Sequence, residues 1–141
     1  MIKDEIKLFI ALNKTLNSLT RKTHKIVTQY GITLSQFAVL EVLYHKGDLS
    51  VGDVQKRILS SSGTIAVIVK NLEKNNLIVR VQDNEDKRKY ILKLTLKGAS
   101  LINKVYPKHE EMLISSINVL NYQEQQNVLK SLRKITGYKN D

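Results

Sequence analysis

Cysteine is absent from this sequence of 141 residues, which excludes disulfides, thiolate nucleophiles and thiol-based redox sensing. Proline occurs once and glycine six times, as in ordinary globular chains, and no internal repeat is visible. No apolar run approaches the roughly 18 residues that a membrane span needs. The amino end, MIKDEIKLFI, lacks the longer apolar core of a signal peptide. We therefore expect a cytoplasmic protein that does not contact the membrane.

The composition favours a polyanionic partner without identifying it. At this length the chain fits a single domain, and 42% of its residues are hydrophobic, which suits a packed core. Lysine and arginine number 23 against 13 acidic residues, giving a formal charge of +10. Such an excess attracts nucleic acid or another acidic surface, but a lysine-rich composition alone produces the same charge.

The sequence offers no arrangement typical of an enzyme or a metal sensor. It contains no G-x-S-x-G turn, no phosphate-binding glycine loop and no clear pair of catalytic carboxylates. Its histidines, His24, His45 and His109, are far apart and lack the spacing of metal ligands. We expect neither enzymatic activity nor a metal or other cofactor.

Apolar residues at spacings of three and four predict helices over most of the chain. The first spans residues 4 to about 30 and ends before Gly31. The second spans about 35–46, with Thr33 or Ser35 as its N-cap and Gly47 as its end. A capping-box spacing at residues 50–53 begins a short third helix. A fourth covers about 62–75 and directs inward Ile65, Ile68, Val69 and Leu72.

The third and fourth helices form a predicted helix-turn-helix. A polar, serine-rich segment leads into the fourth helix, whose outer positions carry side chains able to face DNA. The candidate DNA-binding residues here are Ser61, Ser62, Gly63, Thr64, Val67, Lys70 and Asn71. The alternative is a pair of ordinary core helices.

The hydrophobic period changes to two after Asn76, which predicts a β-hairpin. Its strands lie within residues 77–82 and 90–95, and a charged loop, DNEDKRK, joins them. Lys87, Arg88 and Lys89 in this loop are further DNA-binding candidates, because a hairpin tip can enter a groove. An isolated loop of this kind is as often merely solvated, but directly after a helix-turn-helix the DNA contact is favoured.

Two more helices are expected near the carboxyl end. The first follows residues 95–98 and contains Pro107 as a kink, and the second starts at a capping box, residues 121–124, and ends at Gly137. Together with the first helix of the chain, they carry more apolar surface than one small lobe can cover. We interpret the surplus as the interface of a homodimer.

The order of elements and several motifs resemble the MarR family of bacterial regulators over nearly the whole chain. The motifs are LSQFAVL at residues 34–40, Leu72-Glu73 followed by NLIVR at 76–80, DNEDKR at 83–88 and LTLKG at 94–98. The resemblance implies a mainly α fold with a small β-hairpin wing, that is, a winged helix-turn-helix with N- and C-terminal dimerisation helices. On that plan residues 1–141 form one domain, residues 1–30 and 99–141 dimerise, and residues 34–98 form the winged lobe.

The resemblance also implies how DNA is bound. A homodimer would place its two fourth helices in successive major grooves of a pseudo-palindromic site in double-stranded DNA, with the wings in the flanking minor grooves. Arg88 is the expected minor-groove residue. Ala66 and Val67 stand where many members carry polar or basic side chains. Direct base hydrogen bonds should therefore be few, and contact with thymine methyl groups more important.

The carboxyl-terminal segment resembles, more loosely, a subgroup that answers to quinones and other aromatic compounds. In the family, small molecules bind between the dimerisation helices and the DNA-binding lobe, a place that the resemblance assigns here to Phe9, Phe37, Glu41 and His109. An aromatic pair with one acid and one imidazole suits a phenol or hydroquinone. Alternatively, both phenylalanines are core residues and Glu41 is solvated.

The sequence thus predicts a repressor that binds its operator as a homodimer and is released by a small aromatic ligand. Two alternatives stay open. One is a constitutive repressor without a ligand. The other is a non-specific architectural DNA-binding protein, which would share the basic charge and the winged helix.

Overall fold

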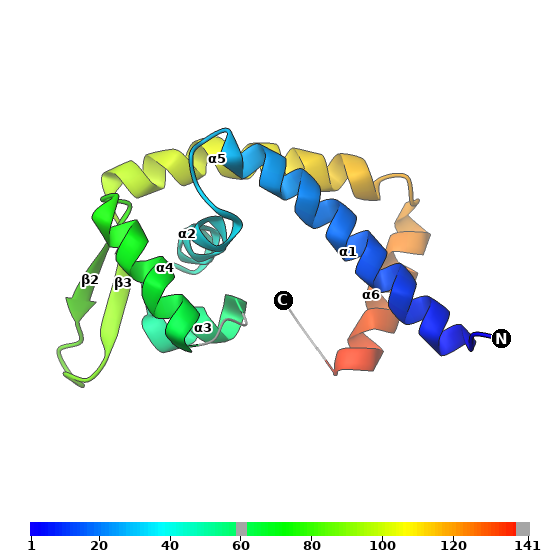
Figure 1. The fold of residues 1–141 in the computed structure, drawn as a ribbon, viewed down its shortest axis with the longest axis horizontal. Helices are drawn as coiled ribbons and strands as arrows, with labels where there is room; N and C mark the ends of the chain where they lie inside the picture. Colours follow the sequence, from blue (N-terminus) through cyan, green and yellow to red (C-terminus); the bar gives the residue numbers. More distant parts are fainter. Residues whose placement is uncertain (59–61, 138–141) are drawn as a thin grey trace.

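The computed structural model describes residues 1–58 and 62–137. Within these residues the elements follow the order α1 (Asp4–Thr28), α2 (Leu34–Lys46), β1 (Leu49–Ser50), α3 (Val51–Ile58), α4 (Ser62–Lys74), β2 (Ile78–Gln82), β3 (Tyr90–Leu94), α5 (Leu96–Ile117) and α6 (Tyr122–Thr136). In Figure 1, α5 runs along the top of an arch, with α2, α3, α4 and the hairpin at one end and α6 at the other. No helix of the described chain is long and apolar enough to span a membrane.

Local capping sets the helix boundaries much as the sequence predicts. The Thr33 hydroxyl accepts a hydrogen bond from the Gln36 amide at 3.1 Å, while the Gln36 side chain accepts one from the Thr33 amide at 3.0 Å. Asn121 and Glu124 form the same reciprocal box at the start of α6. Gly47, which follows α2, has a φ of 80°, in the left-handed region that glycine adopts without a steric penalty.

The wing is a three-stranded antiparallel sheet with the strand order β1-β3-β2. β2 and β3 pair from Ile78 opposite Leu94 to Gln82 opposite Tyr90, which confirms the predicted hairpin. β1 adds a short pairing with β3 that the sequence did not predict, because two residues show no hydrophobic period. The alternating apolar residues predict a buried side along the whole strand, but within β2 only Ile78 is buried.

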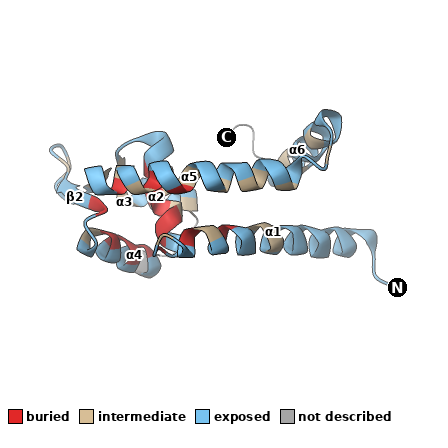
Figure 2. Ribbon diagram, turned by 90° about the horizontal axis from the view of Figure 1, so that it is seen from above, coloured by how far each residue is buried: buried red, intermediate tan, exposed pale blue. Residues whose placement is uncertain are grey.

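The buried core lies in the lobe formed by α2, α3, α4 and the sheet, together with the adjoining parts of α1 and α5 (Figure 2). α4 directs its apolar stripe inward as predicted, with Leu72 fully buried. Burial of each such aliphatic side chain stabilises the fold by about 1.5–3 kcal/mol. The largest fully buried side chains are Leu40, Leu72, Ile78, Leu92, Ile102, Val27, Val39, Val54 and Val105.

The LTLKG motif joins this lobe to the long helix α5. Thr95 caps α5 by accepting a hydrogen bond from the Gly98 amide at 3.0 Å, and its hydroxyl donates to the Asn76 carbonyl at 2.6 Å. Gly98 permits this close approach, because a Cβ at that position would overlap the carbonyl oxygen of Leu77. These contacts hold the start of α5 against Asn76 and Leu77, which follow α4 in the sequence.

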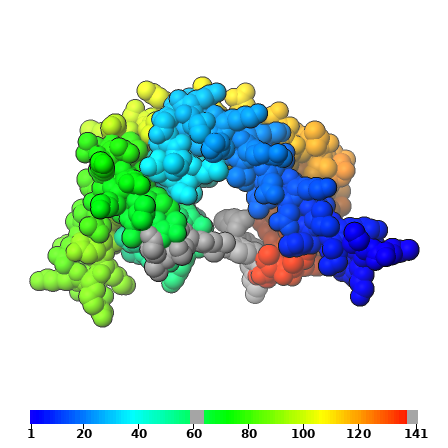
Figure 3. Space-filling view, viewed as in Figure 1, coloured from blue at the N-terminus to red at the C-terminus, as the bar shows by residue number. Residues whose placement is uncertain are grey.

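α1 and α6 are the helices least covered by the rest of the chain. α1 packs antiparallel to α5, and Lys22 Nζ donates to Ser116 Oγ at 3.0 Å. Because Ser116 is next to the last residue of α5, the amino-terminal part of α1 extends beyond that helix. α6 contains no buried residue. These two arms stand apart in Figure 2, and Figure 3 shows a hollow beneath the arch, between the arms and the winged lobe.

Candidate nucleic-acid interface and adjoining aromatic cluster

α4 exposes one side to solvent, opposite its buried stripe. The exposed residues include the predicted contacts Thr64, Val67, Lys70 and Asn71. Val67 is an apolar residue with 59% exposure, so its methyl groups are available for contact with a partner. Ser62 and Gly63 begin α4, but their side chains are not described, and Ser61 lies outside the described residues.

An open groove of about 1100 Å³ lies beside this helix, between α3, α4 and β2. Lys70 and Asn71 line it from α4, Gln55 lines it from α3, and Arg80 lines it from β2. An α-helix with its side chains is about 10–12 Å across, which matches the width of the DNA major groove. The arrangement lets α4 enter a major groove while polar groups on its flank reach the phosphates.

Gln55 and Arg80 were not among the sequence-predicted contacts, because they lie outside both α4 and the hairpin loop, the two segments from which the candidates were taken. Arg80 Nε lies 3.6 Å from Glu73 Oε1, and its Cζ lies 4.7 Å from the centroid of the Tyr90 ring. These contacts orient a guanidinium that is still half exposed. For Arg80 the available sequence signal was a single positive charge among the apolar residues of β2.

Asp86 organises the loop between β2 and β3. Its carboxylate accepts hydrogen bonds from the Arg88 amide at 3.0 Å, from Arg88 Nε at 3.1 Å and from Arg88 Nη2 at 3.2 Å. The side-chain and backbone hydrogen bonds from Arg88 lower the pKa of Asp86 below its ordinary value. Gln82 Nε2 also donates to the Lys87 carbonyl at 2.7 Å, which ties the loop to the end of β2.

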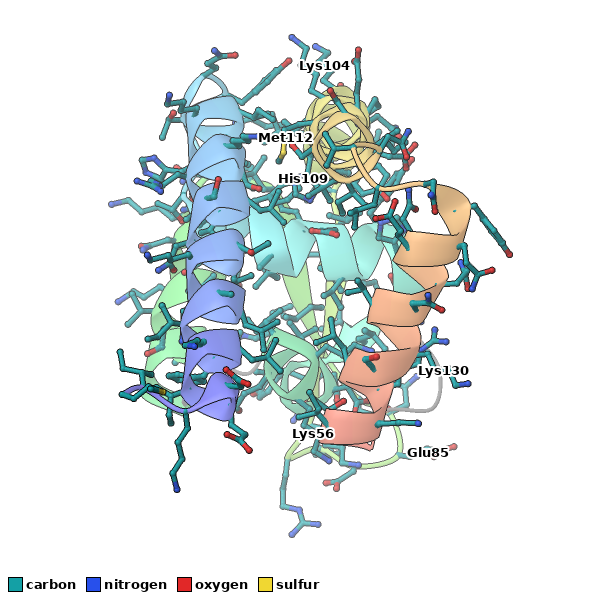
Figure 4. The ribbon with its side chains drawn as sticks, turned by 90° about the vertical axis from the view of Figure 1, so that its right-hand side faces the viewer. Lys56, Glu85, Lys104, His109, Met112 and Lys130 are labelled. Carbon is teal, nitrogen blue, oxygen red and sulfur yellow. The ribbon has the colours of Figure 1, made fainter. Side chains whose placement is uncertain are left out.

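Arg88 is consequently oriented by Asp86 yet open to solvent. The side chain of Arg88 is 91% exposed, compared with 30% for that of Asp86. The neighbouring Lys87 and Lys89 are exposed as well. Figure 4 places Glu85 of this loop and Lys56 of α3 at the same end of the molecule, so the wing and the helix-turn-helix can address one surface. A guanidinium held in this way suits the negative potential of a narrow minor groove.

A second group of candidate residues meets where α1, α2 and α5 pack. Phe37 is buried, and its ring centroid lies 5.0 Å from that of His109 in an edge-on arrangement. Thr23 Oγ1 lies 3.2 Å from His109 Nδ1. Burial lowers the pKa of His109, against the opposing effect of the Glu41 carboxylate. Figure 4 shows His109 between α1 and α5, beside α2. The fold thus brings together Phe37, Glu41 and His109.

Phe9 does not join this group within one chain. It precedes Thr23 by about 14 residues on the same helix, a separation of about 21 Å at the usual helical rise. Phe9 is also 64% exposed. The alternative prediction that both phenylalanines belong to the core is therefore wrong for Phe9, because that residue lies on the part of α1 that extends beyond α5.

Further aromatic rings lie on the same side of the α2–α5 contact. The sequence analysis did not group them with the candidate ligand residues. The ring centroid of Tyr106 lies 4.6 Å from that of His45 and 5.5 Å from that of Tyr44. Burial raises the pKa of Tyr106, and a hydrogen bond with Glu110 raises it further. The spacings of three and four between these residues and Glu41 or His109 were the available signal. The result is a cluster of packed rings, Phe37, Tyr44, His45, Tyr106 and His109, with two carboxylates at its side, which we call the aromatic cluster.

A helix-turn-helix followed by a charged antiparallel wing defines a winged-helix DNA-binding protein. The sequence pattern of the MarR family matches residues 32–90. The HTH-type transcriptional regulator MhqR of Bacillus subtilis (strain 168) is 33% identical over 135 residues, which cover 96% of this chain and 93% of MhqR. The chain belongs to the MarR family and is a DNA-binding transcriptional regulator.

Solved structures share the whole fold. NadR in complex with 4-hydroxyphenylacetate superposes with a TM-score of 0.83, covering 99% of each chain at 22% identity. MepR of S. aureus in its DNA complex superposes with a TM-score of 0.82, covering 97% of this chain and 98% of MepR at 24% identity. These similarities confirm the predicted architecture, a winged helix-turn-helix with long flanking helices.

Proposed function

We propose that this protein is a homodimeric repressor that binds a pseudo-palindromic operator and leaves it when a small aromatic ligand binds. The observation that supports this function most strongly is the exposed, oriented Arg88, in a loop whose Glu85 lies at the same end of the molecule as Lys56 of α3. Dimerisation alone would not require an exposed guanidinium that its own loop holds in one orientation. Such a guanidinium is well suited to contact DNA.

Dimerisation through α1, α5 and α6 is supported by the apolar surface of the two arms. Ile135 near the end of α6 is 65% exposed, and Leu16 of α1 is 64% exposed. A second copy would cover both arms at once, since a two-fold interface uses the same surface of each chain. The exposed apolar residues that we assign to this interface are Ile6, Phe9, Leu12, Leu16, Ile117, Val128, Leu129 and Ile135.

On DNA, each α4 would occupy a major groove and each wing a neighbouring minor groove. Val67 would contact thymine methyl groups, Lys70 and Asn71 would contact base edges or phosphates, and Arg88 would enter the minor groove. Lys87 and Lys89 would contact phosphates. Ser61, Ser62, Gly63 and Thr64, at the amino end of α4, complete the proposed DNA surface.

The ligand would bind at the aromatic cluster, beside Phe37, Glu41 and His109. The cluster lies where α1 and α5, which would dimerise, meet α2 of the DNA-binding lobe, so a molecule bound there can alter the distance between the two α4 helices. NadR, of the same fold, was solved in complex with 4-hydroxyphenylacetate. Phe9 takes part only if the second chain brings it to the cluster.

Sequencing the genomic DNA that the purified protein protects tests this function. We expect fragments that share two inverted half-sites whose centres lie about 10 base pairs apart. Protection without a shared sequence would favour the architectural alternative. Titrating the operator complex with simple phenols then separates a ligand-responsive repressor from a constitutive one.

A further inference from the structure

A pocket of about 510 Å³ lies between the end of α1, the end of α4 and the first half of α5. Its size is within the usual range of small-molecule sites, about 300–1,000 Å³. The loop of residues 30–32 lines it after α1, Asn75 and Leu77 line it after α4, and Lys97, Ser100, Leu101 and Lys104 line it from α5. We call it the basic pocket.

The basic pocket is separate from the aromatic cluster and from the proposed DNA surface. Lys104 lines the pocket, and Tyr106 belongs to the cluster. Because these residues are two positions apart in α5, they differ by about 200° around the helix axis and lie on nearly opposite sides of it. Figure 4 also places Lys104 at the end of the molecule opposite Lys56 and Glu85. Contact with an operator therefore does not account for the charge of this pocket.

The charged side chains that line the basic pocket are all positive. Lys97 Nζ donates one hydrogen bond, to the Asn75 carbonyl at 3.0 Å, and an ammonium group has two more hydrogens to donate. In the described part of the chain, no carboxylate forms an ion pair with Lys97 or Lys104. In the groove beside α4, by contrast, Arg80 lies next to Glu73. The lysines of the basic pocket thus lack a negative partner.

A third lysine lies at the edge of the same pocket. Lys108 Nζ is 5.4 Å from the ring centroid of Tyr30, which lines the pocket. Lys104 and Lys108 are four positions apart on α5, a spacing at which like charges repel each other. An anion bound between them would relieve this repulsion. Ser100, whose hydroxyl can donate a further hydrogen bond, lies on the same part of the helix.

We propose that the basic pocket binds a small anion with two or more negative charges, a phosphorylated or polycarboxylic compound. Lysine ammonium groups recognise charge more than shape, so both kinds of compound share the chemistry that this pocket offers. The proposal depends on neither the dimer nor the aromatic ligand proposed above. It gives the regulator a second binding site, one that stays accessible while the opposite end of the molecule contacts DNA.

Calorimetric titration of the full-length protein at pH 7 and physiological salt tests the proposal. The probes are pyrophosphate, citrate and acetate, in buffer without divalent cations. We expect one site per chain, with pyrophosphate or citrate bound at least about tenfold more tightly than acetate. Tighter binding of pyrophosphate would assign the site to phosphorylated compounds, and tighter binding of citrate to polycarboxylic ones. Failure of both to bind at millimolar concentration would overturn the proposal.

Paired variants separate a defined site from the general positive charge of the protein. Replacing both Lys97 and Lys104 with glutamine should weaken binding of the tighter probe at least about tenfold. The same replacement at Lys130 and Lys134, which are exposed on α6 at the other end of the arch, removes equal charge and should change affinity less than about threefold. Lys104→Gln alone breaks no hydrogen bond in the described chain and should still give part of the loss. Equal losses in the two double variants would contradict the proposal.

A titration of the protein already saturated with duplex DNA tests the location of the site. The basic pocket and the proposed DNA surface lie at opposite ends of the molecule, and physiological salt screens charges beyond about 8 Å. We therefore expect DNA to change the affinity for the anion less than about threefold. Loss of anion binding in the DNA complex would place the anion on the DNA surface and overturn the proposal.

Discussion

Replacing Asp86 tests whether the orientation of Arg88 or the charge of the loop controls operator affinity, because the two effects change that affinity in opposite directions. Replacing Asp86 with alanine removes a negative charge from a loop proposed to face DNA, and electrostatics alone would then strengthen DNA binding. The replacement also removes the acceptor of three hydrogen bonds that orient Arg88 and its backbone. We expect the loss of orientation to dominate, so that operator affinity falls.

The size of the effect follows from the freedom that Arg88 gains. A long side chain that must be immobilised on binding lowers affinity by about threefold to tenfold. A dimer uses two wings, so the Asp86→Ala protein should bind its operator about 10- to 100-fold more weakly. The number of phosphate contacts is unchanged, so the dependence of log Kd on log salt concentration should keep its slope.

Fluorescence anisotropy with a labelled operator duplex measures both quantities. Glu85→Ala is the matched control, because it removes an exposed acid from the same loop and leaves the bonds between Asp86 and Arg88 intact. We expect the control to bind equally well or slightly more tightly. If both variants bind more tightly to a similar degree, Arg88 is acting as a diffuse positive charge and the minor-groove role assigned to it is wrong.

Three further predictions concern the core, the aromatic cluster and the arms. Gly98→Ala should lower the free energy of unfolding by about 1–3 kcal/mol in urea titrations, because the new methyl group overlaps the Leu77 carbonyl; an unchanged midpoint would contradict this. His109 has a pKa below its unfolded value of 6.5, so the unfolded chain binds the proton more readily and stability should fall as the pH drops below 6.5. His109→Gln should weaken that dependence in thermal melts from pH 5 to pH 8, and His24→Gln, at an exposed position, should not. Ile135→Glu should leave the circular dichroism spectrum unchanged and yield monomers in sedimentation experiments, because this side chain is 65% exposed in the single chain; a persistent dimer would place the interface elsewhere.

Helix limits were predictable because they depend on residues near one another in the sequence. Thr33 and Asn121 cap the helices that follow them through bonds to residues three positions away. The outer side of α4 was predictable for a similar reason, since exposure follows the helical period. β1 escaped prediction because its two residues form a strand only by pairing with β3.

The candidate ligand site was only partly predictable. Its residues come from separate helices, and the contact between Thr23 and His109 spans 86 positions of sequence. That contact depends on how α1 packs against α5, which no local pattern specifies. The distance of Phe9 from the other candidates within one chain was not predictable for the same reason, because neither the resemblance nor the helical period shows where α5 ends along α1.

The spacing between half-sites tests the central claim most directly. The recovered operator and a duplex with about five extra base pairs between its half-sites would be compared at physiological salt, with a scrambled duplex as the reference. Five base pairs turn one half-site to the opposite side of the double helix, so a dimer cannot engage both. We predict that the insertion reduces affinity to that of scrambled DNA, a loss on the order of 10³-fold. Undiminished affinity for the lengthened duplex would contradict binding by a symmetric dimer.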